Sequence, residues 1–142
     1  MAAGSSRTKA RKRALDILFE AELRDTNPIA TLEERIAAGT PPVREYTVEL
    51  VRGVVDHAGE IDERIKACLA PGWTLPRMPR VDRNALRIAV YEVDYGDVPD
   101  AVAVAEAVQL VSELSTDESP AFVNGVLRAI TAPAVGEAGA EA

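Results

Sequence analysis

The 142-residue sequence has little of the chemistry from which most enzyme sites are built. It contains one cysteine, Cys68, and one histidine, His57, and only 4% of its residues are aromatic. A single cysteine excludes an internal disulfide framework and fits a reducing compartment. One cysteine and one histidine also exclude the common zinc-binding spacings. Neither residue lies in a motif typical of nucleophilic catalysis, so we expect both to be half-buried packing residues.

Long apolar runs are missing as well. No segment approaches the roughly 20 apolar residues that a membrane-spanning helix requires. The basic N-terminus continues into a segment with Asp16, Glu20 and Glu22, unlike the uncharged core of a signal peptide. The glycines do not have the spacing of a phosphate-binding loop. We therefore expect a cytoplasmic protein that is not an enzyme and that uses no metal and no cofactor.

The charge is unevenly distributed along the chain. The formal net charge is −7, but residues 1–15 contain five basic and no acidic side chains, whereas the remaining 127 contain 11 basic and 23 acidic ones. Because the Debye length is about 8 Å at cellular salt, a polyanion responds to the local patch more than to the net charge. The patch therefore predicts contact with the phosphates of RNA or DNA. Its residues are Arg7, Lys9, Arg11, Lys12 and Arg13.

Apolar residues recur with the period of an α-helix along most of the chain, and prolines and glycines mark the helix ends. Asn27 and Pro28 are typical of a helix start, and Gly39 is typical of a helix end. The pattern predicts an all-α, single domain of about seven helices with short connections. The predicted helices cover residues 8–25, 28–39, 43–57, 60–70, 81–95, 100–114 and 120–130.

Residues 73–79 contain two prolines within four residues and cannot form a regular helix. The Trp, Leu and Met side chains of this stretch predict a loop that folds back onto the core. We expect one domain over residues 8–132, preceded by a flexible basic arm over residues 1–7 and followed by a disordered tail over residues 133–142.

Four segments, in this order along the chain, resemble the bacterial transcription antitermination factor NusB family. They are TKARKRALDILFE (8–20), PRVDRNALRIAVYE (79–92), DVPDAVAVAEAVQL (97–110) and STDESPAFVNGVL (115–127). The resemblance covers residues 8–130 and depends on the ordered set of segments rather than on any one of them. It implies two packed helical subdomains and a non-enzymatic role. That role is to bind the boxA sequence of nascent RNA together with NusE, a ribosomal small-subunit protein, within the RNA polymerase antitermination complex, notably on ribosomal RNA operons.

The resemblance also implies which residues make these contacts. The RNA-binding set is the basic segment named above together with Glu118, Phe122 and Asn124. The NusE-binding set is Phe19, Asp82 and Ala85. Many family members have a basic residue before the aromatic residue of the last helix, where this sequence has Ala121, so we expect one phosphate contact fewer. From the residues alone, Phe122 is either a core side chain or an exposed ring that stacks on a base.

Other readings of the sequence stay open. A similar helical domain occurs fused to RNA cytosine methyltransferases, although 142 residues leave no room for a cofactor domain. The other alternative is a homodimeric helical interaction module that hides its basic face. Light scattering with and without RNA would reveal such a dimer. A second basic group, Arg80, Arg83 and Arg87, falls on one helical face and either binds phosphate or pairs with acids.

Overall fold

The computed structural model describes residues 2–133, and every regular element within them is helical. The elements are α1 (Ala2–Leu23), α2 (Pro28–Ala38), α3 (Glu45–Asp56), α4 (Ala58–Ala67), the 3-10 turn η1 (Leu75–Arg77), α5 (Arg80–Tyr95), α6 (Asp100–Leu114) and α7 (Ser119–Thr131). Residue 1 and residues 134–142, which include nearly all of the expected tail, lie outside the described residues. The predicted all-α class with seven helices is confirmed.

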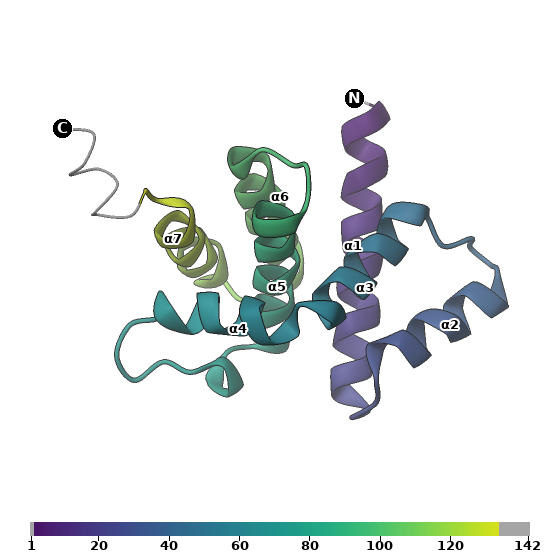
Figure 1. The fold of residues 1–142 in the computed structure, drawn as a ribbon, viewed down its shortest axis with the longest axis horizontal. Helices are drawn as coiled ribbons and strands as arrows, with labels where there is room; N and C mark the ends of the chain where they lie inside the picture. The colour runs from purple at the N-terminus through teal and green to yellow at the C-terminus, as the bar shows by residue number, and fades with distance from the viewer. Residues whose placement is uncertain (1, 134–142) are drawn as a thin grey trace.

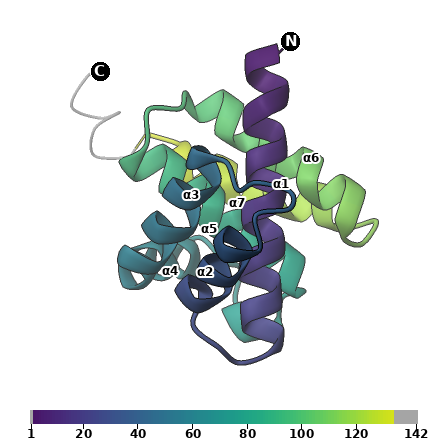
Figure 2. The same ribbon diagram turned by 90° about the vertical axis from the view of Figure 1, so that its right-hand side faces the viewer.

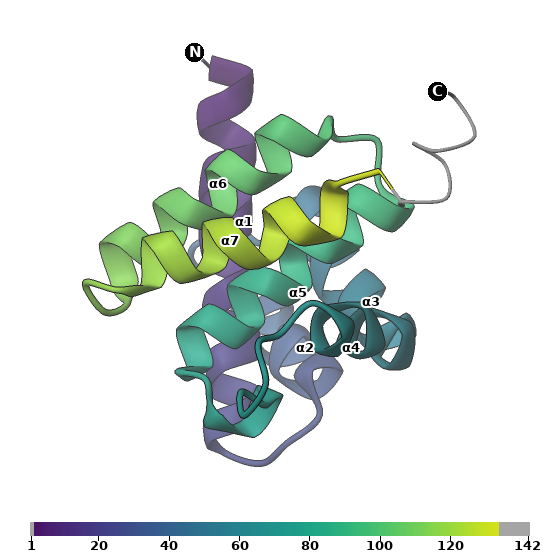
Figure 3. The ribbon, with the colours of Figure 1, turned by 90° about the vertical axis from the view of Figure 1, so that its left-hand side faces the viewer.

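The helices form two packed groups that meet at α5 (Figure 1). Helices α1, α2 and α3 pack against one another, and α4, α6 and α7 pack around α5. Figure 2 shows α1 as a long helix beside which α2 and α3 lie. Figure 3 shows α6 and α7 side by side and running in opposite directions. Helix α5 also contacts α1 and α3, so the two groups share one core.

Helix α5 is central because apolar residues cover most of its circumference. Leu86, Ile88 and Val90 are almost completely inaccessible to solvent. A helix that is apolar on nearly all sides must be enclosed by other elements, as the sequence pattern predicts. Four polar residues of α5 are also buried, and their partners come from α1, α3, α7 and the turn before α7; they are Asp82, Arg83, Asn84 and Glu92.

The helix limits agree with the sequence pattern at most ends. The Asn27 side chain accepts a hydrogen bond from the Ile29 amide and caps α2, and Gly39 ends that helix with a φ of 68°. Helix α6 has the predicted limits. Helix α1 differs because it begins at Ala2, so residues 2–7 of the expected arm are helical. The loop over residues 73–79 folds back onto the core as predicted. Of its Trp, Leu and Met side chains, only Leu75 and Met78 are buried.

Candidate nucleic-acid interface

Helix α1 divides its basic residues between two opposite faces. Arg7 and Arg11 point toward acidic groups on α5, α6 and the turn before α6, whereas Lys9, Lys12 and Arg13 line a surface groove. A helix turns by about 100° per residue, so positions 7 and 11 share a face and positions 9, 12 and 13 lie on the other side. The five basic residues therefore do not form one patch.

Arg11 is a buried structural residue and not a phosphate ligand in this structure. Its Nε donates to both carboxylate oxygens of Glu92, at 3.1 and 2.9 Å, and its Nη1 donates to Glu106 Oε1 at 2.8 Å. The side chains of Arg11 and Glu92 are only 4% and 1% exposed. The Tyr46 hydroxyl also donates to Glu92. The sequence-based assignment of Arg11 to RNA is corrected here, because its donors are used inside the protein.

Burial raises the pKa of Glu92 above its ordinary value, although Tyr46 and Arg11 both favour the carboxylate and oppose that rise. Burial and the same Glu92 carboxylate raise the pKa of the Tyr46 hydroxyl, which therefore stays protonated and acts as the donor. Desolvation of these groups is costly, so the network is stable only while each member keeps its partners.

Arg7 is held less tightly than Arg11. Its guanidinium carbon lies 4.2 Å from the centre of the Tyr46 ring, which is the geometry of a cation–π contact. Its Nη1 lies 3.4 Å from Asp97 Oδ1, and this carboxylate is 80% exposed. Arg7 is thus half-buried and fixes the N-terminal turns of α1 against α3 and the turn before α6. It is positioned away from the groove that the other basic residues line.

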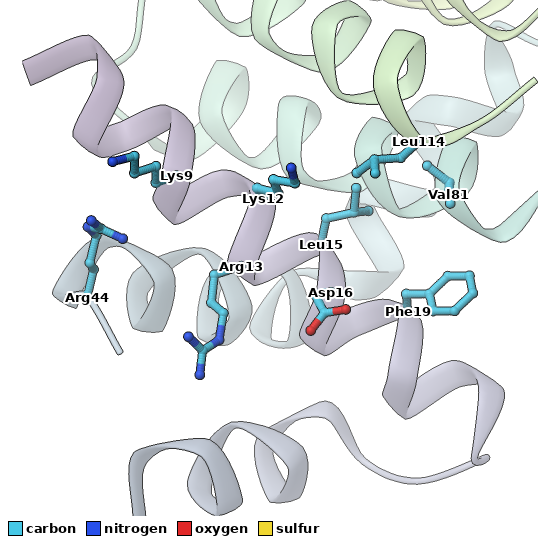
Figure 4. A pocket seen from close by; sticks show the side chains of 9 residues that line it. All are labelled: Lys9, Lys12, Arg13, Leu15, Asp16, Phe19, Arg44, Val81 and Leu114. Atoms are coloured by element: carbon cyan, nitrogen blue, oxygen red, sulfur yellow. The ribbon is translucent and has the colours of Figure 1, made fainter. Parts of the chain in front are cut away.

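The outer face of α1 forms one side of a groove of about 480 Å³. Figure 4 shows Lys9, Arg13 and Arg44 toward one end of this groove and Leu15, Val81, Leu114 and Phe19 toward the other. Lys12 and Asp16 complete its lining. We call the first part the cationic end and the second the apolar end. The groove can therefore accept a ligand, or two adjoining ligands, with both negative charge and apolar surface.

The cations of the groove are largely free to bind an anion. Lys9, Arg13 and Arg44 have no carboxylate partner within residues 2–133. Lys12 lies 3.6 Å from Glu113, but both side chains are about half exposed, and such a pair contributes little. The sequence reasoning missed Arg44, because it is an isolated basic residue just before α3. Arg44 becomes part of the basic group only because α3 packs against α1.

Two of the three expected partner-binding residues are inside the protein. Asp82 is 2% exposed, and its oxygens accept hydrogen bonds from Ser115 Oγ at 2.6 Å and Ser119 Oγ at 2.9 Å. Ala85 is fully buried. Neither side chain can touch a partner in this structure, so the sequence-based assignment is corrected: Asp82 holds the turn between α6 and α7 to the start of α5. Phe19 is half-buried and lines the apolar end of the groove.

The three residues expected to bind RNA near α7 do not share one face: Phe122 lies one turn from Glu118, and Asn124 lies elsewhere. Glu118 is exposed and precedes the first turn of α7. Phe122 is half-buried against the core, and its ring centre lies 5.5 Å from that of Trp73. Asn124 lies two positions further, on another face of α7, in a hollow between α6 and α7 that Val104 and Val108 also line.

The side chains of the second basic group, Arg80, Arg83 and Arg87, are paired with carboxylates, which is one of the two alternatives given by the sequence. Arg83 pairs with Glu22 and also donates to two backbone carbonyls. Arg87 pairs with Asp62 at 2.9 Å and with Glu22 at 3.3 Å, and Arg80 Nε lies 3.4 Å from Glu22. Burial alone would raise the pKa of Glu22, but its bonds to Arg83 and Asn84 and the charge of Arg87 outweigh burial and lower it.

Comparison with known proteins agrees with this architecture. The model of the NusB family matches residues 8–132. The chain belongs to the NusB family. The transcription antitermination protein NusB of Nocardioides sp. is 56% identical over 127 residues, which cover 89% of this chain and 93% of that protein. This chain is therefore a transcription antitermination protein, and its family is non-enzymatic.

Two solved NusB structures are similar as well. The T. maritima NusB structure superposes with a TM-score of 0.79 at 30% identity, covering 96% of this chain and 97% of that one. A crystal structure of the antitermination factors NusB and NusE in complex with dsRNA has a TM-score of 0.76 at 32% identity, covering 87% of this chain and 94% of that one.

Within the described residues, no three His, Cys, Asp or Glu side chains converge in a way that could hold a metal ion. In the same part of the chain, no helix combines the length and the apolar character that a membrane crossing requires.

Proposed function

We propose that this chain binds boxA RNA together with NusE and, in the cytoplasm, joins the RNA polymerase antitermination complex that keeps transcription of ribosomal RNA operons processive. The observation that carries the proposal is the groove along α1, where four exposed or half-buried cations gather beside apolar side chains on an otherwise acidic protein. The solved complex of a 32% identical NusB with NusE and dsRNA supports both ligands.

The cationic end of the groove binds the RNA backbone. The groove is lined by Lys9, Lys12 and Arg13 of α1 and by Arg44, which precedes α3, so a strand that runs along it meets four positive charges. Asp16 is the one carboxylate in the lining and lies nearer the apolar end. Phosphate contacts of this kind give affinity and orientation, and the reading of bases requires other groups.

The apolar end of the groove binds NusE. Leu114 is 42% exposed although it is a large apolar residue, and Leu23, one turn of α1 beyond Phe19, is 57% exposed. Leu114, Phe19 and Val81 line the groove next to the cationic end, and Leu23 follows Phe19 on the same face of α1. Exposed apolar surface bordered by charge is typical of a protein-binding site. The two ligands would then lie side by side in one groove, which accounts for binding both at once.

The RNA part of the proposal is tested by the salt dependence of binding. Each phosphate contact on a single strand contributes about −0.7 to the slope of log K against log salt, so four contacts give about −2.8. We expect the triple variant Lys9→Ala, Lys12→Ala, Arg13→Ala to lose about 2 of that slope. Arg52→Ala is the matched control, because Arg52 is exposed and lies outside the groove. An unchanged slope in the triple variant would refute the assignment.

The partner part is tested by calorimetry with purified NusE. We expect Phe19→Ala to weaken NusE binding by at least about tenfold, since buried aromatic anchors dominate protein interfaces. Ile36→Ala is the control, because Ile36 is 46% exposed on α2 and does not line the groove. Equal effects of the two substitutions would contradict a NusE site at Phe19.

A homodimer that covers the same groove is the second candidate, and the exposed Leu114 and Leu23 favour it. Light scattering with and without boxA RNA separates the two candidates. A monomer that gains the mass of one RNA supports the proposed function, whereas a stable dimer that RNA does not dissociate supports a self-association module.

A further inference from the structure

Trp73 is the single tryptophan of the chain, and nearly half of its surface, 46%, is exposed. It lies in the connection between α4 and η1, where Leu75 and Met78 are buried and anchor the chain to the core. The indole Nε1–H has no acceptor within the described residues. A large aromatic residue with an open surface and an unused donor is the kind of group that binds nucleobases.

The Trp73 ring has an aromatic support. The centre of the Phe122 ring lies 5.5 Å from that of Trp73, and the planes are inclined by 41°. Phe122 itself packs against the hydrophobic core. The less exposed ring therefore holds the more exposed one. In this arrangement Phe122 is the more buried ring, and Trp73 offers the open face.

Hydrogen bonds hold the turn that carries Trp73 in place. The Trp73 amide donates to the Ala70 carbonyl at 3.0 Å, and Arg77 Nη1 donates to the Gly72 carbonyl at 3.1 Å. Gly72 has a φ of 89°, a conformation that glycine adopts without strain. A rigid aromatic group loses little entropy when it binds, so a preorganised Trp73 is suited to recognition.

The buried Arg83 fixes the other side of the same loop. Its Nη1 donates to the Leu75 carbonyl at 2.6 Å and to the Met78 carbonyl at 3.0 Å. Because Arg83 is only 9% exposed, these bonds join the loop to the central helix α5. Trp73 is exposed, but the backbone on both sides of it is held.

The surroundings of Trp73 also fit a nucleic acid. Lys66 and Arg80 line the same hollow as Trp73, and each has a single carboxylate partner within the described residues. The carboxylates of Glu22 and Asp62 line it too, but they are paired with Arg83 and Arg87, which also belong to the lining. Arg77 has no carboxylate partner in that part of the chain. A phosphate next to a base stacked on Trp73 would therefore meet positive charge.

Trp73 is joined to the groove of α1 through the turn between α6 and α7. Leu114, at the end of α6, lines the groove, and Asp82 then binds the hydroxyls of Ser115 and Ser119. Phe122 follows within one turn of α7 and contacts Trp73. The groove and the hollow of Trp73 also adjoin at the start of α5, where Val81 lines the groove and Arg80 lines the hollow.

We propose that Trp73, supported by Phe122, is a stacking platform for an unpaired base of the bound RNA. This inference rests on the proposed function and adds a base-binding position to it. The cations of the groove bind phosphates whatever the sequence, whereas Trp73 requires a base that is not held in a duplex.

The emission of Trp73 gives a direct test, because no other tryptophan contributes to it. We expect a single-stranded boxA RNA to quench this emission in the full-length protein, since a stacked base quenches an indole. Inorganic polyphosphate, which can bind the same cations but has no base, is expected to leave the emission unchanged. Equal quenching by polyphosphate would overturn the proposal, because the signal would then report a change of charge or conformation.

Substitution gives the second test. A stacked base contributes about 1–3 kcal/mol, so Trp73→Ala should lower RNA affinity about 5- to 150-fold, and Trp73→Phe should retain most of it. The salt slope should not change, because stacking releases no counterions. Tyr95→Ala is the matched control, since Tyr95 is 40% exposed and stacks on His57 instead.

The outcomes separate this inference from the proposed function. The platform is overturned, and the proposed function stands, if RNA binds with the expected salt slope but does not quench the wild-type emission and binds Trp73→Ala with wild-type affinity. RNA that does not bind the wild-type protein overturns both. Circular dichroism shows whether Trp73→Ala is folded, and the quenching of the wild-type emission by RNA tests the platform if it is not.

Discussion

The pairing of Arg11 with Glu92 makes a prediction that separates structural from RNA-binding arginines. Arg11→Ala removes three hydrogen bonds and leaves the Glu92 carboxylate, 1% exposed, without its guanidinium partner. Breaking a buried ion pair in this way costs about 3–5 kcal/mol of unfolding free energy. For a chain of this size, that corresponds to a fall in melting temperature of roughly 10–15 °C.

Urea titration followed by circular dichroism measures the loss, and a double-mutant cycle identifies its origin. Glu92→Ala alone should also destabilise the protein, and the double variant should lose less than the two single losses added together. Lys12→Ala is the control from the next position of α1. It is expected to change stability by less than about 0.5 kcal/mol and to reduce the RNA salt slope by about 0.7.

The opposite pattern would refute the reasoning. If Arg11→Ala kept the stability of the wild type and reduced the salt slope by about 0.7, Arg11 would be a phosphate ligand and its burial would not describe the protein in solution.

Three further predictions concern stability. Gly53→Ala would place a Cβ atom 2.1 Å from Tyr91 Cε1, so we expect a loss of about 1–3 kcal/mol in thermal melts. Asp82→Ala leaves the buried hydroxyl of Ser119 and the half-buried hydroxyl of Ser115 without this acceptor and should cost about 2–3 kcal/mol in urea titration. The pKa of Glu22 is lowered from 4.5 in the folded state, so its contribution is present above pH 4.5 and is lost as the pH falls. Melts between pH 3 and 7 should therefore show a flatter profile for Glu22→Gln, and identical profiles would contradict the Arg83 pairing.

The helices were predictable because their ends are marked by local chemistry. Asn27, Pro28 and Gly39 define α2, and Pro99 precedes α6. The start of α1 was not predictable in this way, because no cap precedes it. Contacts of Arg7 with Tyr46 and Asp97, distant in the sequence, hold the first turns of that helix.

The candidate site was only partly predictable, because burial and partners depend on tertiary packing. Arg44 and Trp73 carried no local signal of function. Asp82 and Ala85 were assigned to a surface, but the packing of α6 and α7 on α5 encloses both. The Leu75 and Met78 positions of the loop were predicted correctly, whereas Trp73 was expected to be buried and is not.

The two faces of α1, however, can be derived from the sequence once the helix period is applied to the basic residues. Counting about 100° per residue from Arg7, Arg11 lies near 40° and Leu18 near 20°, in the middle of the apolar face. Lys9, Lys12 and Arg13 lie between about 140° and 240°, on the opposite face. The local excess of charge at the N-terminus therefore overstates the number of cations that can meet RNA. Because the inward arginines are neutralised by the acids of α5 and α6 and by Asp97, and Arg44 joins the groove from α3, the expected salt slope is about −2.8 instead of the −3.5 that five contacts would give.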